Sequence, residues 1–245
     1  MRQLSVQTIN VNWINADKKA ALINNHVHIW RIKISAFTAE LHSLQTLLEV
    51  KELQKIERYQ HETDRQTRII SRAVLRILLS RYLLIDPAEI RFKLDDYKKP
   101  VLQQIDSAGL YFNVSHTGDW ILIGIAANSI GVDLEKIDAS FIDQNLLEFS
   151  CSSAEKIFIQ SAANPVESFY QLWTKKEALL KATGKGLTDN LAQVPSLDGI
   201  HEVSGLIIGS EENWQMINFE IDEKHTGSTA FIPVKTVVQF INFQL

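Results

Sequence analysis

Two short segments of this chain hold the side chains best suited to chemistry. Residues 131–137 read GVDLEKI, and the alternation of apolar and acidic positions predicts a strand with two carboxylates on one face. Residues 173–181 read WTKKEALLK, and helical spacing places a glutamate and a lysine one turn apart on one face. The four side chains are Asp133, Glu135, Glu177 and Lys181. Because Mg²⁺ takes oxygen ligands from carboxylates, water and substrate phosphates, this set predicts phosphoryl-transfer chemistry.

A strand and a helix must position these groups, and the rest of the pattern predicts a mixed chain. Alternation predicts strands over 27–34, 111–114, 120–126, 130–134, 201–207, 213–221 and 229–243. Helical spacing predicts helices over 40–58, 62–84 and 166–182, the last closing at Gly184. Neighbouring strands are short enough to pair antiparallel, so we expect an α+β fold rather than a doubly wound parallel sheet.

Composition limits the class of protein. The 245 residues, 45% of them hydrophobic, are enough for one large domain or two small lobes. No segment approaches the run of roughly 18 apolar residues that a membrane span needs, and the N-terminus lacks a signal-peptide pattern. We therefore expect no membrane partner. The single cysteine, Cys151, fits a reducing compartment, which predicts a cytoplasmic location.

Charge is distributed unevenly along the chain, although the net charge is only −4. Residues 1–110 hold 17 Lys+Arg against 12 Asp+Glu, whereas residues 111–245 hold 8 against 17. A basic first half beside an acidic second half suits a polyanionic ligand with a metal between the two halves. The small net charge argues against a general nucleic-acid binder.

Three further segments accompany the first two. Residues 99–101 read KPV, residues 112–118 read FNVSHTG and residues 184–187 read GKGL. In this order the five segments resemble the motifs of the 4′-phosphopantetheinyl transferases, in outline G-[VI]-D-x-E-x-[IV] and W-[ST]-x-K-E-[AS]-x-x-K. The length is similar to that of the monomeric Sfp-type branch, and the resemblance is firm over residues 50–190. The family often has glycine where this chain has Lys98, so the backbone there is expected to differ.

This resemblance implies a fold and an activity. The fold would be two similar α+β lobes, residues 1–127 and 128–245, related by a pseudo-twofold axis with the active site between them. The enzyme would transfer the 4′-phosphopantetheine group of coenzyme A to a serine of an apo acyl- or peptidyl-carrier protein and release adenosine 3′,5′-bisphosphate, with Mg²⁺ as cofactor. The chain is long enough for both lobes, which predicts a monomer rather than a trimer of one-lobe subunits.

The resemblance also implies roles for individual side chains. Asp133, Glu135 and Glu177 would bind Mg²⁺. Glu177 would also take the proton of the carrier serine, directly or through water, and the sequence does not separate ligand from base. Lys181 would contact the phosphates, and Trp173 would anchor its helix in the core. The contacts to coenzyme A would come from Lys55, Arg68, Lys99, Pro100, Ser115, His116 and Lys181.

Helix 62–84 carries four arginines within one arc, namely Arg65, Arg68, Arg72 and Arg76. The residues alone allow either a solvated basic face or a grip on the 3′-phosphate of coenzyme A, shared with His116. The sequence does not decide which arginine makes that contact, although Arg68 is preferred and a structural role is equally open for Arg76. Lys176 points away from Glu177, and pairing with another acid is expected for it.

Two other functions stay open on the residues alone. A non-catalytic module that binds coenzyme A or a nucleotide would be favoured by loss of a metal ligand or of the motif lysine, and all of these are present. A metal-dependent phosphohydrolase would place water where the transferase places the serine, but it has no motif of its own here. The carrier pathway and the preference between Mg²⁺ and Mn²⁺ are not determined by the sequence.

Overall fold

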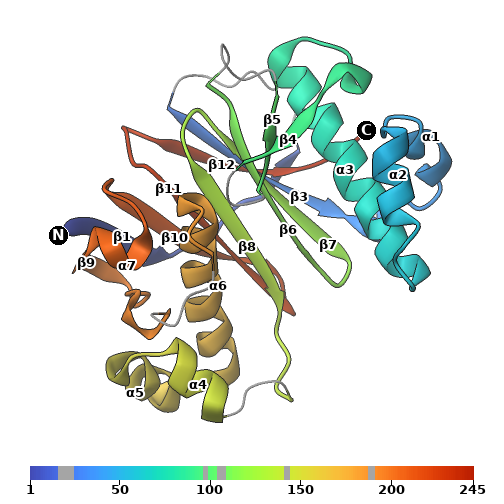
Figure 1. The fold of residues 1–245 in the computed structure, drawn as a ribbon. Helices are drawn as coiled ribbons and strands as arrows, with labels where there is room; N and C mark the ends of the chain where they lie inside the picture. The colour runs from blue at the N-terminus through green and yellow to red at the C-terminus, as the bar shows by residue number, and fades with distance from the viewer. Residues whose placement is uncertain (16–24, 96–98, 104–108, 141–143, 187–190) are drawn as a thin grey trace.

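The computed structural model describes residues 1–15, 25–95, 99–103, 109–140, 144–186 and 191–245. Two five-stranded sheets, each with helices packed against it, make up most of these residues (Figure 1). The fold is therefore α+β, as expected. In the described ranges, no helix is long and apolar enough to cross a membrane.

The first sheet has the strand order β2-β12-β3-β7-β6. Its strands are β2 (Ile14–Asn15), β3 (His26–Lys33), β6 (Tyr111–Thr117), β7 (Trp120–Ala126) and β12 (Val237–Asn242). Strand β7 is antiparallel to both β3 and β6, whereas β12 runs parallel to β3 and to β2. The last strand of the chain thus completes the sheet that begins with β3.

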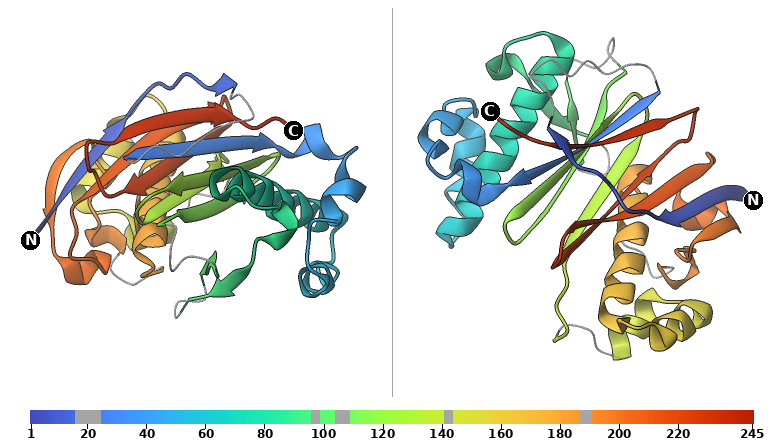
Figure 2. Two further views of the ribbon diagram at one scale, coloured as in Figure 1. Left: turned by 90° about the horizontal axis from the view of Figure 1, so that it is seen from above. Right: turned by 180° about the vertical axis from the view of Figure 1, so that it is seen from behind.

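The second sheet has the order β8-β11-β10-β1-β9. Its strands are β1 (Arg2–Thr8), β8 (Ile130–Lys136), β9 (Gly199–Val203), β10 (Trp214–Asp222) and β11 (His225–Phe231). Strand β11 is antiparallel to β8 and β10, β1 is parallel to β10, and β9 is antiparallel to β1. The first strand therefore lies among late strands, and β12 lies beside the early β3 (Figure 2).

Three strands of each sheet share one topology. Strands β3, β6 and β7 form the order β3-β7-β6, and strands β8, β10 and β11 form the order β8-β11-β10. In each set the helices follow the first strand and the third strand pairs between the other two. The division of the chain at residues 127 and 128 remains a prediction, and the terminal strands β1 and β12 each join the sheet built mainly from the other half.

Seven α-helices and several short elements complete the described residues. The helices are α1 (Leu41–Gln45), α2 (Val50–Ile56), α3 (Glu62–Leu83), α4 (Gln144–Ser150), α5 (Ser153–Ser161), α6 (Pro165–Thr183) and α7 (Gly205–Ile208). Strands β4 (Phe92–Leu94) and β5 (Pro100–Leu102) form a small separate sheet. Single 3₁₀ turns are η1 (Ile34–Phe37), η2 (Pro87–Glu89) and η4 (Leu191–Gln193).

Helix α6 is defined by its ends and by one close approach. Asn164 caps its first turn and Pro165 occupies the first helical position, while Gly184 (φ 78°) ends it in the left-handed conformation. Gly131 on β8 lies so close to α6 that a Cβ atom would fall 2.0 Å from the Ala178 carbonyl oxygen. The two elements that carry the acidic motifs can therefore pack directly together.

Three element predictions were wrong in detail. The segment 40–58 forms two helices, because Glu49 and Glu52 form a capping box that begins α2. The segment 201–207 is a strand only to Val203, since the Ser204 hydroxyl accepts a hydrogen bond from the Leu206 amide and begins α7. The segment 229–243 contains the end of β11 and all of β12, which belong to different sheets. Pro233, which has no N–H to donate, lies in the connection.

The two sheets are joined by a shared apolar cluster. Its buried members from the first sheet and its neighbours are Val27, Ile29, Leu122, Ala126 and Phe240, and those from the second sheet are Ile130, Val132, Leu134, Ile217, Phe219, Ile221 and Phe231. Burial of this much apolar surface is the main force that holds the sheets together. A second cluster packs α3 against the outer part of the first sheet.

Candidate active site

A polar cluster joins the two sheets where β6, β8 and α6 meet. Asp133 is only 3% exposed, and its Oδ1 atom accepts a hydrogen bond from Lys181 Nζ at 2.6 Å. Ser115 on β6 receives a hydrogen bond from Lys181 Nζ at 3.1 Å, and the Ser115 hydroxyl donates to Asp133 Oδ1 at 3.2 Å. Three of the predicted site residues, from three elements, are therefore in direct contact.

The other two carboxyl groups of the motifs have unusual acidities. Burial raises the pKa of Glu177 to about 7, and the negative charge of Asp133 adds to this increase. Burial, followed by the charges of Asp133 and Glu177, likewise raises the pKa of Glu135 to about 7. The ammonium of Lys181 partly opposes both increases. Each carboxyl can therefore accept or release a proton near neutral pH, as a general base must.

The donor atoms of this cluster suit a hard cation. Asp133 Oδ2 and Glu177 Oε1 are buried and have no hydrogen-bond partner among the described residues. Such oxygens are costly to bury alone, and carboxylate oxygens are the ligands that Mg²⁺ prefers. Across the described ranges, however, no three His, Cys, Asp or Glu side chains are grouped closely enough to hold a metal ion as they stand. The Lys181 ammonium instead neutralises Asp133.

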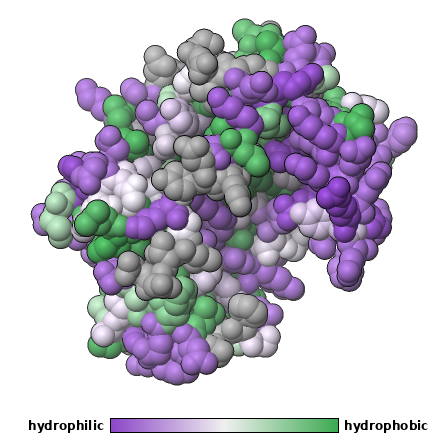
Figure 3. All heavy atoms as spheres, viewed as in Figure 1, coloured by the Kyte–Doolittle hydropathy of each residue, from purple (hydrophilic) through white to green (hydrophobic). Residues whose placement is uncertain are grey.

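A basic cavity of about 510 Å³ lies beside this cluster, between α2, α3, β4, β5 and β6. Six cationic or titratable nitrogen side chains line it, namely Lys51, Lys55, Arg68, Arg72, Lys93 and His116. Glu52 is the only acidic residue among its described lining residues. Figure 3 shows hydrophilic side chains gathered over the α2 and α3 side of the molecule. The cavity is thus suited to a ligand with several negative charges.

Aromatic and apolar groups form the remaining wall of the basic cavity. The guanidinium of Arg68 lies 5.0 Å from the Tyr59 ring, and that of Arg72 lies 4.9 Å from the Phe92 ring. Pro100 and Phe112 also line the cavity. A ligand that combines phosphates with a planar ring would match this mixture.

The four arginines of α3 do not share one role, so the interpretation as a common solvated face is wrong. Arg76 is completely buried and donates to Glu52 and to the Ile90 carbonyl, which makes it structural. Arg65 pairs with Glu62 and donates to a backbone carbonyl. The structural role left open for Arg76 is confirmed, and the helical wheel could not decide it because α2 and β4 pack over part of the arc. Only Arg68 and Arg72 line the basic cavity.

His116 lies half-buried at the edge of the basic cavity. Burial lowers its pKa, and the neighbouring charges of Arg68 and Lys181 lower it further. A bound phosphate would offset both cations and favour the protonated imidazole. The contact of His116 with an anionic ligand remains a prediction, and the residue lines the cavity that would hold such a ligand.

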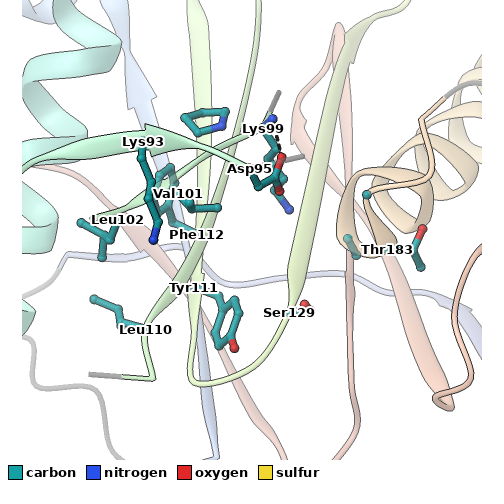
Figure 4. Close-up of a pocket in the computed structure, with 13 residues that line it drawn as sticks. Lys93, Asp95, Lys99, Val101, Leu102, Leu110, Tyr111, Phe112, Ser129 and Thr183 are labelled. Carbon is teal, nitrogen blue, oxygen red and sulfur yellow. Dashed lines mark hydrogen bonds between the residues drawn. The ribbon is translucent and has the colours of Figure 1, made fainter. Parts of the chain in front are cut away.

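Lys99 and Pro100 border a second cavity of about 330 Å³, which shares Lys93, Pro100 and Phe112 with the basic cavity. Figure 4 shows Lys99 and Asp95 on one side of this second cavity and Thr183, at the end of α6, on the other. The Lys99 amine donates to the Lys181 carbonyl at 2.8 Å and so caps the end of α6. Burial lowers the pKa of the Lys99 amine. Lys98 and Leu187 lie outside the described residues.

Two contacts of the site were not anticipated from the sequence. Trp173 is half-buried and packs against the apolar cluster of Phe169, as expected of an anchor, but a hydrogen bond from its side chain also favours the ionised form of Glu135. Asn113 accepts a hydrogen bond from the Val132 amide at 2.9 Å and so links β6 to β8. Asparagine inside a strand pattern was the available signal for this link. The expected acid partner of Lys176 is confirmed as Glu155, at 2.8 Å.

Comparison with known proteins gives matches over most of the chain. The family model described as "4'-phosphopantetheinyl transferase, N-terminal" matches residues 30–129, and that described as "4'-phosphopantetheinyl transferase superfamily" matches residues 129–231. A putative 4′-phosphopantetheinyl transferase of Synechocystis is 37% identical over 153 residues, which cover 61% of this chain and 62% of that protein.

Two further relatives match over different shares of their lengths. The 4′-phosphopantetheinyl transferase HetI of Nostoc is 29% identical over 179 residues, which cover 71% of this chain and 76% of that protein. The 4′-phosphopantetheinyl transferase Sfp of Bacillus subtilis is 29% identical over 135 residues, which cover 55% of this chain and 59% of that protein. The matches thus span less than two thirds of the Synechocystis and Bacillus proteins. Because the two family models together span residues 30–231, the chain belongs to the 4′-phosphopantetheinyl transferase superfamily.

Proposed function

We propose that this protein transfers the 4′-phosphopantetheine group of coenzyme A to a serine of an apo carrier protein. The observation that carries the proposal is the contact between Ser115, Asp133 and Lys181 beside a cavity lined by cations. Coenzyme A combines a 3′-phosphate, a pyrophosphate and an adenine ring. These groups match the cations and the aromatic walls of the basic cavity.

In this reaction the oxygen of the carrier serine forms a bond to the phosphorus that bears pantetheine. The bond from that phosphorus to the oxygen of the adenosine 5′-phosphate breaks, and adenosine 3′,5′-bisphosphate leaves with the electron pair. Glu177, whose pKa burial raises to about 7, is suited to take the serine proton directly or through water. Lys181 and His116 lie where they can balance phosphate charge, and Lys55 and Arg68 can bind the 3′-phosphate.

Mg²⁺ is proposed as the cofactor, held by Asp133, Glu135 and Glu177. Support comes from the unpartnered buried oxygens of Asp133 and Glu177 and from the preference of Mg²⁺ for carboxylates. When bound, the ion would supply positive charge to the pyrophosphate of coenzyme A. Because Lys181 now contacts Asp133, its ammonium must share or release that carboxylate when a metal binds.

The partners and the state of the protein are part of the same proposal. The acceptor would be an acyl- or peptidyl-carrier protein, and the protein would act as a monomer of 27.9 kDa. The presence in one chain of two three-strand sets with the same topology, one in each sheet, supports one site per chain. The proposed cytoplasmic location rests on the single cysteine, Cys151.

Intact-mass spectrometry tests this function. An apo acyl-carrier protein and an apo peptidyl-carrier domain are each incubated with this protein, coenzyme A and Mg²⁺. Transfer is expected to add about 340 Da, the mass of the phosphopantetheine group, to at least one carrier. The gain should require the metal and disappear with EDTA. Binding of coenzyme A without any gain on either carrier would instead support a non-catalytic binding module.

A further inference from the structure

The turn between β6 and β7 lies at the edge of the first sheet and directly follows two predicted site residues. Ser115 and His116 lie just before the last residue of β6, Thr117, which pairs with Trp120 across the turn. Any movement of this turn would therefore shift Ser115 and His116 relative to Asp133 on the second sheet. The apolar cluster joins the sheets along their faces, but directional contacts are needed to fix such a turn.

One hydrogen bond links this turn directly to the second sheet. Trp120 Nε1 donates to Asp222 Oδ2 at 2.7 Å, from β7 to the end of β10. The other oxygen of Asp222 accepts from His225 Nδ1 at 2.7 Å and from the Lys224 amide at 2.9 Å. The Oδ1 atom is thus fixed by the β10–β11 turn, and this holds the carboxylate so that Oδ2 faces the indole N–H.

Two further contacts cross between the same segments. His225 packs under Gly118, where a Cβ atom would lie 2.9 Å from the imidazole Nε2. Gly118 also has a φ of 54°, which favours glycine. Arg31, whose guanidinium lies 5.3 Å from the Trp120 ring, donates to the Ile221 carbonyl. The Trp120–Asp222 hydrogen bond and the close packing of Gly118 on His225 therefore hold one turn against the other, and Arg31 on β3 bridges Trp120 and the Ile221 carbonyl.

The far side of the turn is fixed within its own sheet. The Asp119 carboxylate accepts from the Ser35 amide at 2.7 Å and from the Ser35 hydroxyl at 2.6 Å. The Asp119 carbonyl accepts from the Ile34 amide at 2.8 Å. Because the turn is anchored on both sides, its position depends on the contacts to the second sheet as well as on those to the first.

We propose that Trp120, Asp222 and His225 form a clasp that positions the β6–β7 turn, and with it Ser115 and His116, against the strand that carries Asp133. They act as positioning residues, since none of them lines either cavity of the site. The clasp is defined by structural contacts alone, whereas its effect on ligand binding rests on the proposed function. The two parts can therefore be tested separately.

Hydrogen exchange measured by mass spectrometry tests the clasp itself. In Trp120→Phe, which loses only the indole N–H and part of the ring, amides of residues 111–126 should exchange about three- to tenfold faster, as expected for loss of one hydrogen bond. Trp214→Phe is the matched control. It also loses an indole hydrogen bond, from Trp214 Nε1 to Ser210 Oγ at 3.0 Å, but that bond lies within the second half of the chain. Unchanged exchange at 111–126 in Trp120→Phe would overturn the clasp.

Calorimetric titration with adenosine 3′,5′-bisphosphate tests the positioning role. Trp120→Phe and Asp222→Ala should each weaken binding about three- to tenfold. Trp214→Phe should bind as the wild type does. Asp222→Asn should weaken binding less than Asp222→Ala, because its single amide oxygen can accept from the indole but its NH2 group then faces the Lys224 amide, which is also a donor. Faster exchange with unchanged affinity in Trp120→Phe would overturn the positioning role. If the wild type does not bind the nucleotide, the proposed function fails, while the exchange result still decides the clasp.

Discussion

The buried pair of Lys176 and Glu155 provides a prediction that the structure allows in quantitative form. The Lys176 ammonium is 1% exposed and donates to Glu155 at 2.8 Å, to the Ser150 carbonyl at 2.6 Å and to the Leu191 carbonyl at 3.1 Å. Removal of one partner of a buried ion pair leaves an uncompensated charge and costs about 3–5 kcal/mol. We therefore expect Lys176→Met to lose about 3–5 kcal/mol of unfolding free energy.

Denaturation in guanidinium chloride measures this loss, and the adjacent helix supplies a matched control. Lys156 pairs with Glu148 at 2.6 Å, close to the 2.8 Å that separates Lys176 from Glu155, but the side chains of Lys156 and Glu148 are 23% and 56% exposed. Lys156→Met should therefore cost at most about 1 kcal/mol. The double variant Lys176→Met with Glu155→Gln should recover part of the loss of unfolding free energy, because neither member of this pair is then charged. A loss below about 1 kcal/mol in Lys176→Met would refute the reasoning.

Three more predictions concern the site. Gly131→Ala should unfold at a much lower denaturant concentration, since its Cβ would lie 2.0 Å from a backbone oxygen of α6. Burial raises the pKa of Glu177 from 4.5 to about 7, so the folded metal-free protein holds this proton more tightly than the unfolded chain and loses that stabilisation as pH rises from 4.5 to 7. The unfolding temperature of the wild type should therefore fall relative to that of Glu177→Gln over this interval, and parallel curves would contradict the shift. Arg68→Ala should weaken binding of adenosine 3′,5′-bisphosphate about tenfold, as measured by calorimetry, whereas Arg65→Ala, outside the cavity, should not.

The acidic motifs could be located from the sequence because local pattern determines them. Alternation placed Asp133 and Glu135 on a strand, and helical spacing placed Glu177 and Lys181 on one face of α6. The sequence could not show which side chain each of these carboxylates and the lysine would contact in the folded protein. The contact of Lys181 with Asp133 depends on the close packing that Gly131 allows, and packing between distant segments leaves no periodic signal.

The same limit explains the errors. Helical spacing placed Arg76 on the same arc as the other arginines and left a structural role open, and only the fold shows that α2 covers it and Glu52 neutralises it. The terminal strands β1 and β12 exchange sheets, which a reading of neighbouring strands cannot anticipate. Residues of the clasp such as Trp120 and Asp222 are far apart in the chain and belong to no motif, so only the fold reveals them.

The central claim is that the carboxylates of β8 and α6 perform the transfer while the basic cavity holds coenzyme A. Single-turnover intact-mass measurement of an apo carrier, with wild type and Glu177→Gln each saturated with coenzyme A and Mg²⁺, tests it most directly. The account predicts that the wild type modifies the carrier and that Glu177→Gln, with coenzyme A bound, modifies it at least about a hundredfold more slowly. Equal rates in the two proteins would contradict the claim.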